Sequence, residues 1–98
     1  MTMAIPPKAV PAIILHPDDT VATLMGDAKA GDHITLGPDQ TIIAAEDVPI
    51  YFKISLERHS LGRKVIKYGQ TIGTATAIIQ KGAKVHIHNM TSTRGRLS

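Results

Sequence analysis

Short alternating segments separated by glycine are the feature that most constrains the fold of this chain. In three places an alternating segment is followed by a glycine, and an aliphatic residue stands three positions after that glycine. The three stretches are residues 21–24 with Gly31 and Ile34, residues 53–56 with Gly62 and Val65, and residues 74–77 with Gly82 and Val85. Alternation with a period of two is the pattern of a half-buried strand, so the repetition favours units of strand, turn and strand.

Further strands are expected in three apolar segments. Residues 12–15 form an apolar run that ends at the turn-type cluster 16–19, and residues 33–36 and 41–44 flank the turn-type sequence 37–40. An aspartate before residue 20 could cap a helix over residues 20–29, but Val21, Thr23 and Gly26 disfavour it. The count is about eight short strands at spacings of about 8–12 residues. This predicts an all-β fold with at most short helices, such as a helical turn within residues 56–61.

The chain of 98 residues is short enough to form one domain. Pro6, Pro7 and Pro11 lack backbone donors and restrict the residues before them, so residues 1–11 are expected to form a flexible leader. We expect the folded domain to span residues 12–90. Residues 91–98 show no apolar pattern and are expected to form a tail.

The absence of cysteine excludes several kinds of site at once. Disulfides, zinc sites with thiolate ligands, iron–sulfur clusters and a thiol nucleophile all require that side chain. Any metal ion would therefore be held by histidine, carboxylate, carbonyl or water.

The formal charge of +3 and the pI of about 9.5 favour anionic partners. The basic residues are dispersed, and one Phe, two Tyr and no Trp provide few rings on which bases could stack. A small anionic ligand is therefore favoured over nucleic acid. No segment has the apolar length of a signal peptide or a membrane span, which predicts a cytoplasmic location with no membrane partner.

Two histidines stand two residues apart near the end of the expected domain. If residues 85–89 form a strand, His86 and His88 share one face, and Val85 and Ile87 face the core. This pattern has two readings, which the spacing alone leaves open. The pair is either the solvent-facing side of an amphipathic strand, or two imidazoles that bind one metal ion or anion, or transfer protons. Two ligands do not complete a metal site.

Three motifs in fixed order resemble a known family. They are Lys67-Tyr68-Gly69, the sequence Ile72-Gly73 with Ala75-Thr76, and His86-x-His88-Asn89. Together, over about residues 13–90, they resemble the N-terminal small domain of the altronate and galactarate dehydratase family, a SAF-type domain with a β-clip fold. Family members fuse this domain to a larger one or, as in sulfolactate sulfo-lyase, carry it as a separate small subunit.

The resemblance implies a metal-dependent lyase of sugar acid metabolism, commonly with iron, that removes water or sulfite from a hydroxy acid. This chain would be the small subunit of a two-component altronate hydrolase type of enzyme, inactive alone, and would share an active site with a large catalytic subunit. Its substrate would be an anionic hydroxy acid. The implied catalytic or metal-binding residues are His86 and His88. The implied substrate-binding residues are Lys53, Lys67, Tyr68 and Asn89.

Three positions depart from the family pattern, and one of them is Thr20, which stands where many relatives have the asparagine of Asp-Asn-Val. Phe52 stands where the family usually has histidine before Lys53, and Tyr51 stands where glycine is usual. The alternative function is a free-standing β-clip module that binds an anionic sugar or a protein. The sequence does not identify the substrate, for which sulfolactate is an alternative, or the metal. It also does not assign the role of each histidine or the oligomeric state, for which a homo-oligomer is one option. The Lys67-Tyr68-Gly69 motif is read either as a turn in which Gly69 takes a positive φ or as a direct substrate contact.

Overall fold

The computed structural model describes residues 7–92, which form nine strands and no helix. The all-β prediction is confirmed, and with no helix in this part there is none that could cross a membrane. The predicted helical turn within residues 56–61 is wrong, because these residues form bends and a turn around an isolated bridge. The strands are β1 (Ala9–Ile13), β2 (Val21–Leu24), β3 (His33–Gly37), β4 (Gln40–Ile43), β5 (Lys53–Ser55), β6 (Lys64–Lys67), β7 (Gln70–Ala75), β8 (Lys84–Val85) and β9 (Met90–Ser92).

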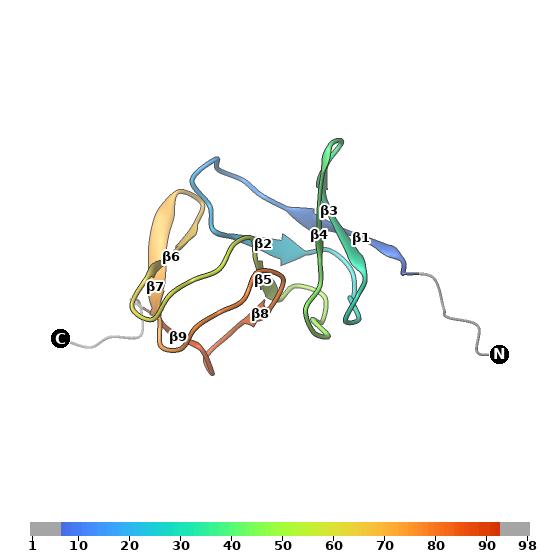
Figure 1. Ribbon diagram of the computed structural model, residues 1–98. Coiled ribbons are helices and arrows are strands. Elements are labelled where there is room, and N and C mark those ends of the chain that lie inside the picture. Colours follow the sequence, from blue (N-terminus) through green and yellow to red (C-terminus); the bar gives the residue numbers. More distant parts are fainter. Residues whose placement is uncertain (1–6, 93–98) are drawn as a thin grey trace.

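The strands form two sheets. A six-stranded sheet has the order β4-β3-β1-β2-β5-β8, and a three-stranded sheet has the order β6-β7-β9. All pairs are antiparallel except β1 with β3. The β3–β4 and β6–β7 hairpins lie at opposite ends of the described structure, with β2, β5 and β8 between them (Figure 1).

The sheets extend beyond the expected domain limits at both ends. Strand β1 begins at Ala9, so three residues of the predicted leader belong to the sheet, and Val10 is buried in the core. Its parallel pairing with β3 explains the difference, because Val10 aligns with Ile34 in the register of that pair. Strand β9 continues to Ser92, two residues into the predicted tail. Residues 1–6 and 93–98 lie outside the described part, so the leader and tail there remain predictions.

The described structure contains an internal repeat. Two isolated antiparallel bridges join Ala28 with Val48 and His59 with Ile79. Both residues of the second bridge stand 31 positions after those of the first, from 28 to 59 and from 48 to 79. The backbone hydrogen bonds repeat with the same offset. The Gly31 N–H donates to the Ala44 carbonyl, and the Gly62 N–H donates to the Ala75 carbonyl. In the same way the Tyr51 N–H donates to the Leu24 carbonyl, and the Gly82 N–H donates to the Ser55 carbonyl. We call the part around the Ala28–Val48 bridge the first half and the part around the His59–Ile79 bridge the second half.

Each half contains two equivalent turns, and each turn requires a residue with positive φ. Three of the four residues are Gly31, Gly62 and Gly82, with φ of 93°, 84° and 86°. These are the three glycines that define the repeated sequence pattern. The fourth is Tyr51, with φ of 71°. An L-residue in this region costs about 1–2 kcal/mol relative to glycine.

The core consists of two aliphatic clusters, one for each half. The first-half cluster includes Val10, Leu24, Ile34 and Ile54. The second-half cluster consists of Val21, Val65, Ala75, Ile79, Ala83 and Val85. Alternation along the strands directs these side chains inward, as the sequence pattern predicts.

Candidate functional site

The segment that contains the histidine pair is a turn. Strand β8 ends at Val85, and the Asn89 N–H donates to the His86 carbonyl at 3.0 Å. The buried Asn89 side chain accepts from the His86 N–H at 3.0 Å and donates to the Lys84 carbonyl at 2.8 Å. Asparagine favours such local bonds to the backbone over a strand ladder. The predicted strand over residues 85–89 is therefore wrong, and Ile87 is 80% exposed instead of facing the core.

This turn gives the two histidines different environments. The half-buried His86 ring lies 4.9 Å from the Phe52 ring, centroid to centroid, whereas His88 is exposed. Asn89 stabilises the turn, and its role in binding substrate remains a prediction. Among residues 7–92 no group of three or more His, Cys, Asp or Glu side chains gathers that could hold a metal ion. The described residues thus do not by themselves fit the metal that the family resemblance implies.

Three of the predicted substrate-binding residues gather in one pocket of about 420 Å³. Lys53 reaches it from β5, and Lys67 and Tyr68 reach it from the β6–β7 hairpin. The other lining residues are Gln70, Thr71, Ile72, Met90 and Ser92. The pocket combines two ammonium groups with hydroxyl, amide and apolar side chains, and neither His86 nor His88 lines it.

The two lysines give this pocket a positive potential. Partial burial lowers the pKa of Lys53, and the nearby positive charge of Lys67 lowers that pKa further. The Lys67 ammonium also lies 4.7 Å from the centroid of the Tyr68 ring. Because two like charges repel each other at this site, an anion bound between them would be stabilised by both.

The tip of the β6–β7 hairpin is held in a conformation that is strained for tyrosine. Tyr68 and Gly69 have φ of 55° and 71°, so both central residues of the two-residue turn are in the left-handed region, as in a type I′ turn. The predicted positive φ of Gly69 is confirmed. The Gly69 N–H donates to Asp19 at 2.8 Å, and a Cβ at Gly69 would lie 2.8 Å from the His16 ring. These contacts fix the hairpin tip that carries Tyr68 into the pocket.

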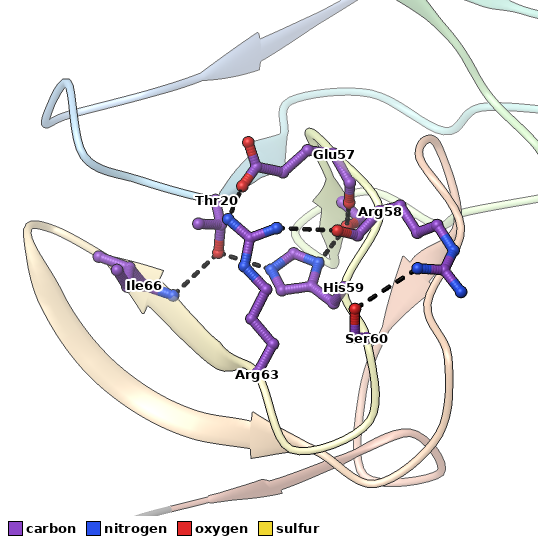
Figure 2. Close-up of polar contacts among 8 residues, drawn as sticks. Thr20, Glu57, Arg58, His59, Ser60, Arg63 and Ile66 are labelled. Atoms are coloured by element: carbon purple, nitrogen blue, oxygen red, sulfur yellow. Dashed lines mark hydrogen bonds and ion pairs between the residues drawn. The ribbon is translucent and has the colours of Figure 1, made fainter.

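A buried polar network, which the sequence analysis missed, connects the elements around the second half. His59, Ser55 and Thr20 are all buried, and Figure 2 shows the His59 ring between the Thr20 side chain and the chain around Glu57. His59 occupies the position that Ala28 holds in the first half. The signal that could have revealed it is this repeat, since a histidine stands where the equivalent position is a core alanine.

The hydrogen bonds of this network define the tautomer of His59. The Ser55 hydroxyl donates to the Glu57 carbonyl at 2.5 Å, so Ser55 accepts from Nδ1 of His59 at 2.8 Å. Nε2 then accepts from the Thr20 hydroxyl at 2.8 Å, and the Thr20 oxygen accepts from the Ile66 N–H at 3.0 Å. The neutral ring with its proton on Nδ1 satisfies every partner in this chain of bonds.

The electrostatic surroundings keep this ring neutral. Burial lowers the pKa of His59, and the nearby positive charge of Arg63 lowers it further, although the Glu57 carbonyl and carboxylate oppose the shift. Arg63 also pairs with Glu57 beside the network (Figure 2). Because the ring is fully buried and both nitrogens have partners, we assign His59 a structural role that ties β2, β5 and β6 together.

Comparisons with known proteins agree with the fold and the motifs. Residues 10–93 match the family described as altronate/galactarate dehydratase SAF domain. Altronate dehydratase from Escherichia coli (strain K12) is 38% identical over 86 residues, which cover 88% of this chain and 17% of that protein. The (2R)-sulfolactate sulfo-lyase subunit alpha from Paracoccus pantotrophus is 36% identical over 56 residues, which cover 57% of this chain and 84% of that subunit. This chain thus spans only a small part of the altronate dehydratase that it matches.

Proposed function

This chain belongs to the altronate/galactarate dehydratase SAF domain family, and we propose that it is the small component of a two-component lyase that dehydrates a sugar acid. In this proposal the chain binds the anionic substrate, and a large catalytic subunit completes the active site. One of its relatives is itself a subunit, the alpha subunit of sulfolactate sulfo-lyase.

The observation that carries the proposal is the pocket with Lys53, Lys67 and Tyr68. A sugar acid has one carboxylate and several hydroxyl groups. The two ammonium groups suit the carboxylate, and the polar side chains of Gln70 and Thr71 suit hydroxyl groups on the same molecule. The size of the pocket is in the range that small ligands occupy.

The two lysines would contribute to the reaction as well as to binding. Dehydration of a hydroxy acid removes a proton from the carbon next to the carboxylate and a hydroxyl group from the neighbouring carbon, which leave together as water. When the proton is abstracted, negative charge builds on the carboxylate oxygens. Ammonium groups that already face those oxygens stabilise this charge without reorganisation. Lys53 and Lys67 would therefore orient the substrate and lower the barrier to proton abstraction.

His86 and His88 remain the proposed proton-transfer groups of this chain. Of the two, His86 is the nearer candidate, because its ring contacts Phe52, the direct neighbour of Lys53 in the sequence. Its orientation toward the substrate would depend on the large subunit. The divalent metal, proposed to be iron, would provide Lewis-acid chemistry when bound, but the described residues do not form its site, and we assign no step to it here.

A second candidate function is a binding module for an anionic sugar acid that works without a catalytic partner. Its basis is that Lys53, Lys67 and Tyr68 already lie together in this chain, so the cationic groups that would bind the acid do not depend on a partner. In that case the chain would bind altronate or galactarate alone, and no dehydration would follow on addition of a large subunit.

The test combines binding and activity. We expect NMR shifts on titration with altronate, galactarate or sulfolactate to centre on Lys53, Lys67 and Tyr68, and we expect dehydration or desulfonation only when the large subunit from the same organism is added. Lys67→Met should lower the affinity for the acid about tenfold, or about 1.4 kcal/mol. Lys64→Met on the same strand is the control, because Lys64 is exposed and does not line the pocket. Equal effects of the two substitutions would contradict the proposed site.

A further inference from the structure

The two halves differ in how their turns are capped. In the first half, the Ala30 N–H donates to the Asp47 carboxylate at 2.9 Å, and the Ile50 N–H donates to the Asp27 carboxylate at 2.8 Å. Each aspartate therefore reaches across the Ala28–Val48 bridge to the opposite turn. Such bonds satisfy backbone donors that a turn leaves unpaired.

In the second half the carboxylates are missing. By the offset between the bridges, Ile78 stands where the first half has Asp47, and Arg58 stands where it has Asp27. The corresponding amides belong to Leu61 and Lys81. Among the described residues neither of these two amides has a hydrogen-bond acceptor. The second half thus presents two backbone donors that carboxylates occupy in the first half.

The side chains around these amides are apolar or cationic. The antiparallel His59–Ile79 bridge places Ile78 opposite Ser60, the chain neighbour of Leu61, and Ile78 and Leu61 are 53% and 70% exposed. The same bridge places Arg58 opposite Gln80, the chain neighbour of Lys81. Within residues 7–92, Arg58 donates only to the Ser60 hydroxyl and Lys81 forms no ion pair. We call Arg58, Leu61, Ile78 and Lys81 the second-half face.

We infer that the second-half face docks an apolar segment of the large subunit that carries aspartate or glutamate. Its carboxylates would accept from the Leu61 and Lys81 amides and pair with Arg58, as Asp47 and Asp27 cap the turns of the first half. Its apolar side chains would cover Leu61 and Ile78. This inference rests on the proposed function, because it names the surface through which the small component meets its partner.

Two observations favour the large subunit over a second copy of this chain. The carboxylates of the first half that would fit the second-half face, Asp27 and Asp47, already cap their own turns, so a second copy would have to break those bonds. In addition, the SAF domain corresponds to only 17% of the related altronate dehydratase, so most of that protein lies outside the matched domain. Exposed apolar side chains with unpaired donors and cations are the chemistry of a protein contact.

The first test replaces the missing cap. Ile78→Asp places a carboxylate at the position equivalent to Asp47, where it should cap the Leu61 amide and leave the melting temperature unchanged or raised. The same change removes the apolar contact and places a negative charge against the carboxylates of the partner. We therefore expect the affinity for the large subunit from the same organism, measured by calorimetry, to fall at least tenfold, while altronate binding to the pocket stays unchanged.

The second test reverses the charge of one lysine in each half. Lys81→Glu on the second-half face should weaken the complex at least tenfold, whereas Lys29→Glu on the first half should not. Full affinity for the large subunit in both Ile78→Asp and Lys81→Glu would overturn the inference and leave the proposed function intact. Failure of the unmodified chain to bind the large subunit would overturn both. A homodimer that Ile78→Asp dissociates would assign the face to a second copy instead.

Discussion

The buried network around His59 gives a prediction whose magnitude can be worked out from its hydrogen bonds. Thr20→Val keeps the size of the side chain but removes the hydroxyl that accepts from the Ile66 N–H and donates to Nε2 of His59. His59 is buried and Ile66 is half-buried, and both would be left unpaired. An unpaired buried group costs about 1–3 kcal/mol, so the two together predict a loss of about 2–5 kcal/mol in the free energy of unfolding.

This loss is a large fraction of the stability of a small domain. A domain of this size typically has about 5–15 kcal/mol of stability, and each kcal/mol corresponds to about 4–8 °C in melting temperature. We therefore expect Thr20→Val to lower the melting temperature by at least about 8 °C in calorimetry. Urea unfolding followed by circular dichroism measures the same free energy at a fixed temperature.

The matched control is Thr23→Val on the neighbouring strand β2. The Thr23 side chain is only half-buried and has no hydrogen bond among the described residues, and valine favours strands as well as threonine does. Its effect should stay within about 0.5 kcal/mol. Equal stability losses for the two variants, or a loss below about 1 kcal/mol for Thr20→Val, would refute the network as described.

Three further predictions concern other parts of the chain. Folding lowers the pKa of His59, so the unfolded state binds more protons than the folded state below about pH 6.5. The free energy of unfolding should therefore fall as the pH drops below that value, by at most about 1.4 kcal/mol per pH unit for this group. Imidazole NMR should find His59 still neutral there, and a charged ring would contradict the assignment. Tyr51→Gly should raise the stability by up to about 1 kcal/mol in urea unfolding, since it relieves the positive φ at a smaller cost in unfolded-state entropy, whereas Tyr51→Ala should be neutral. Gly73→Ala should lower the free energy of unfolding by more than about 2 kcal/mol, because the new Cβ would meet the backbone of β9. Gly37→Ala is the control and should not destabilise the fold, because the space around Gly37 is open. Similar melting temperatures for these two variants would rule out the close approach of β7 and β9.

The sequence predicted the parts of the fold that depend on local patterns. Glycines at three equivalent turns identified three strand units, and the order of the family motifs identified the domain and grouped Lys53, Lys67 and Tyr68 in one site. The fourth unit could not be found in the same way, because its positive φ belongs to Tyr51 and the pattern requires glycine. Sequence patterns describe which residue type usually takes a positive φ, whereas the structure around one turn can hold another residue type in that conformation.

Two of the errors share a physical cause, which is a hydrogen bond made by a polar side chain. Alternation predicted a strand over residues 85–89, but the Asn89 side chain closes a turn there through two backbone hydrogen bonds. No sequence motif marked His59, and it is buried, with a partner at Thr20 that is far away in the sequence. Alternation carries no information about such bonds, since it reports only which side of a strand a residue faces.

The internal repeat indicates where the two halves have acquired different roles. The tip of the β3–β4 hairpin is closed by the pair Gly37 and Gln40, and the tip of the β6–β7 hairpin is closed by Lys67 and Gln70. By the offset between the two bridges, Lys67 stands where the first half has Leu36, and this lysine lines the pocket. The second half also carries His59 in place of a core alanine. The polar network, the cationic pocket and the uncapped turns thus all lie in the second half. We expect substitutions in the pocket and at the uncapped turns to change function more than stability, and substitutions in the network around His59 to change stability.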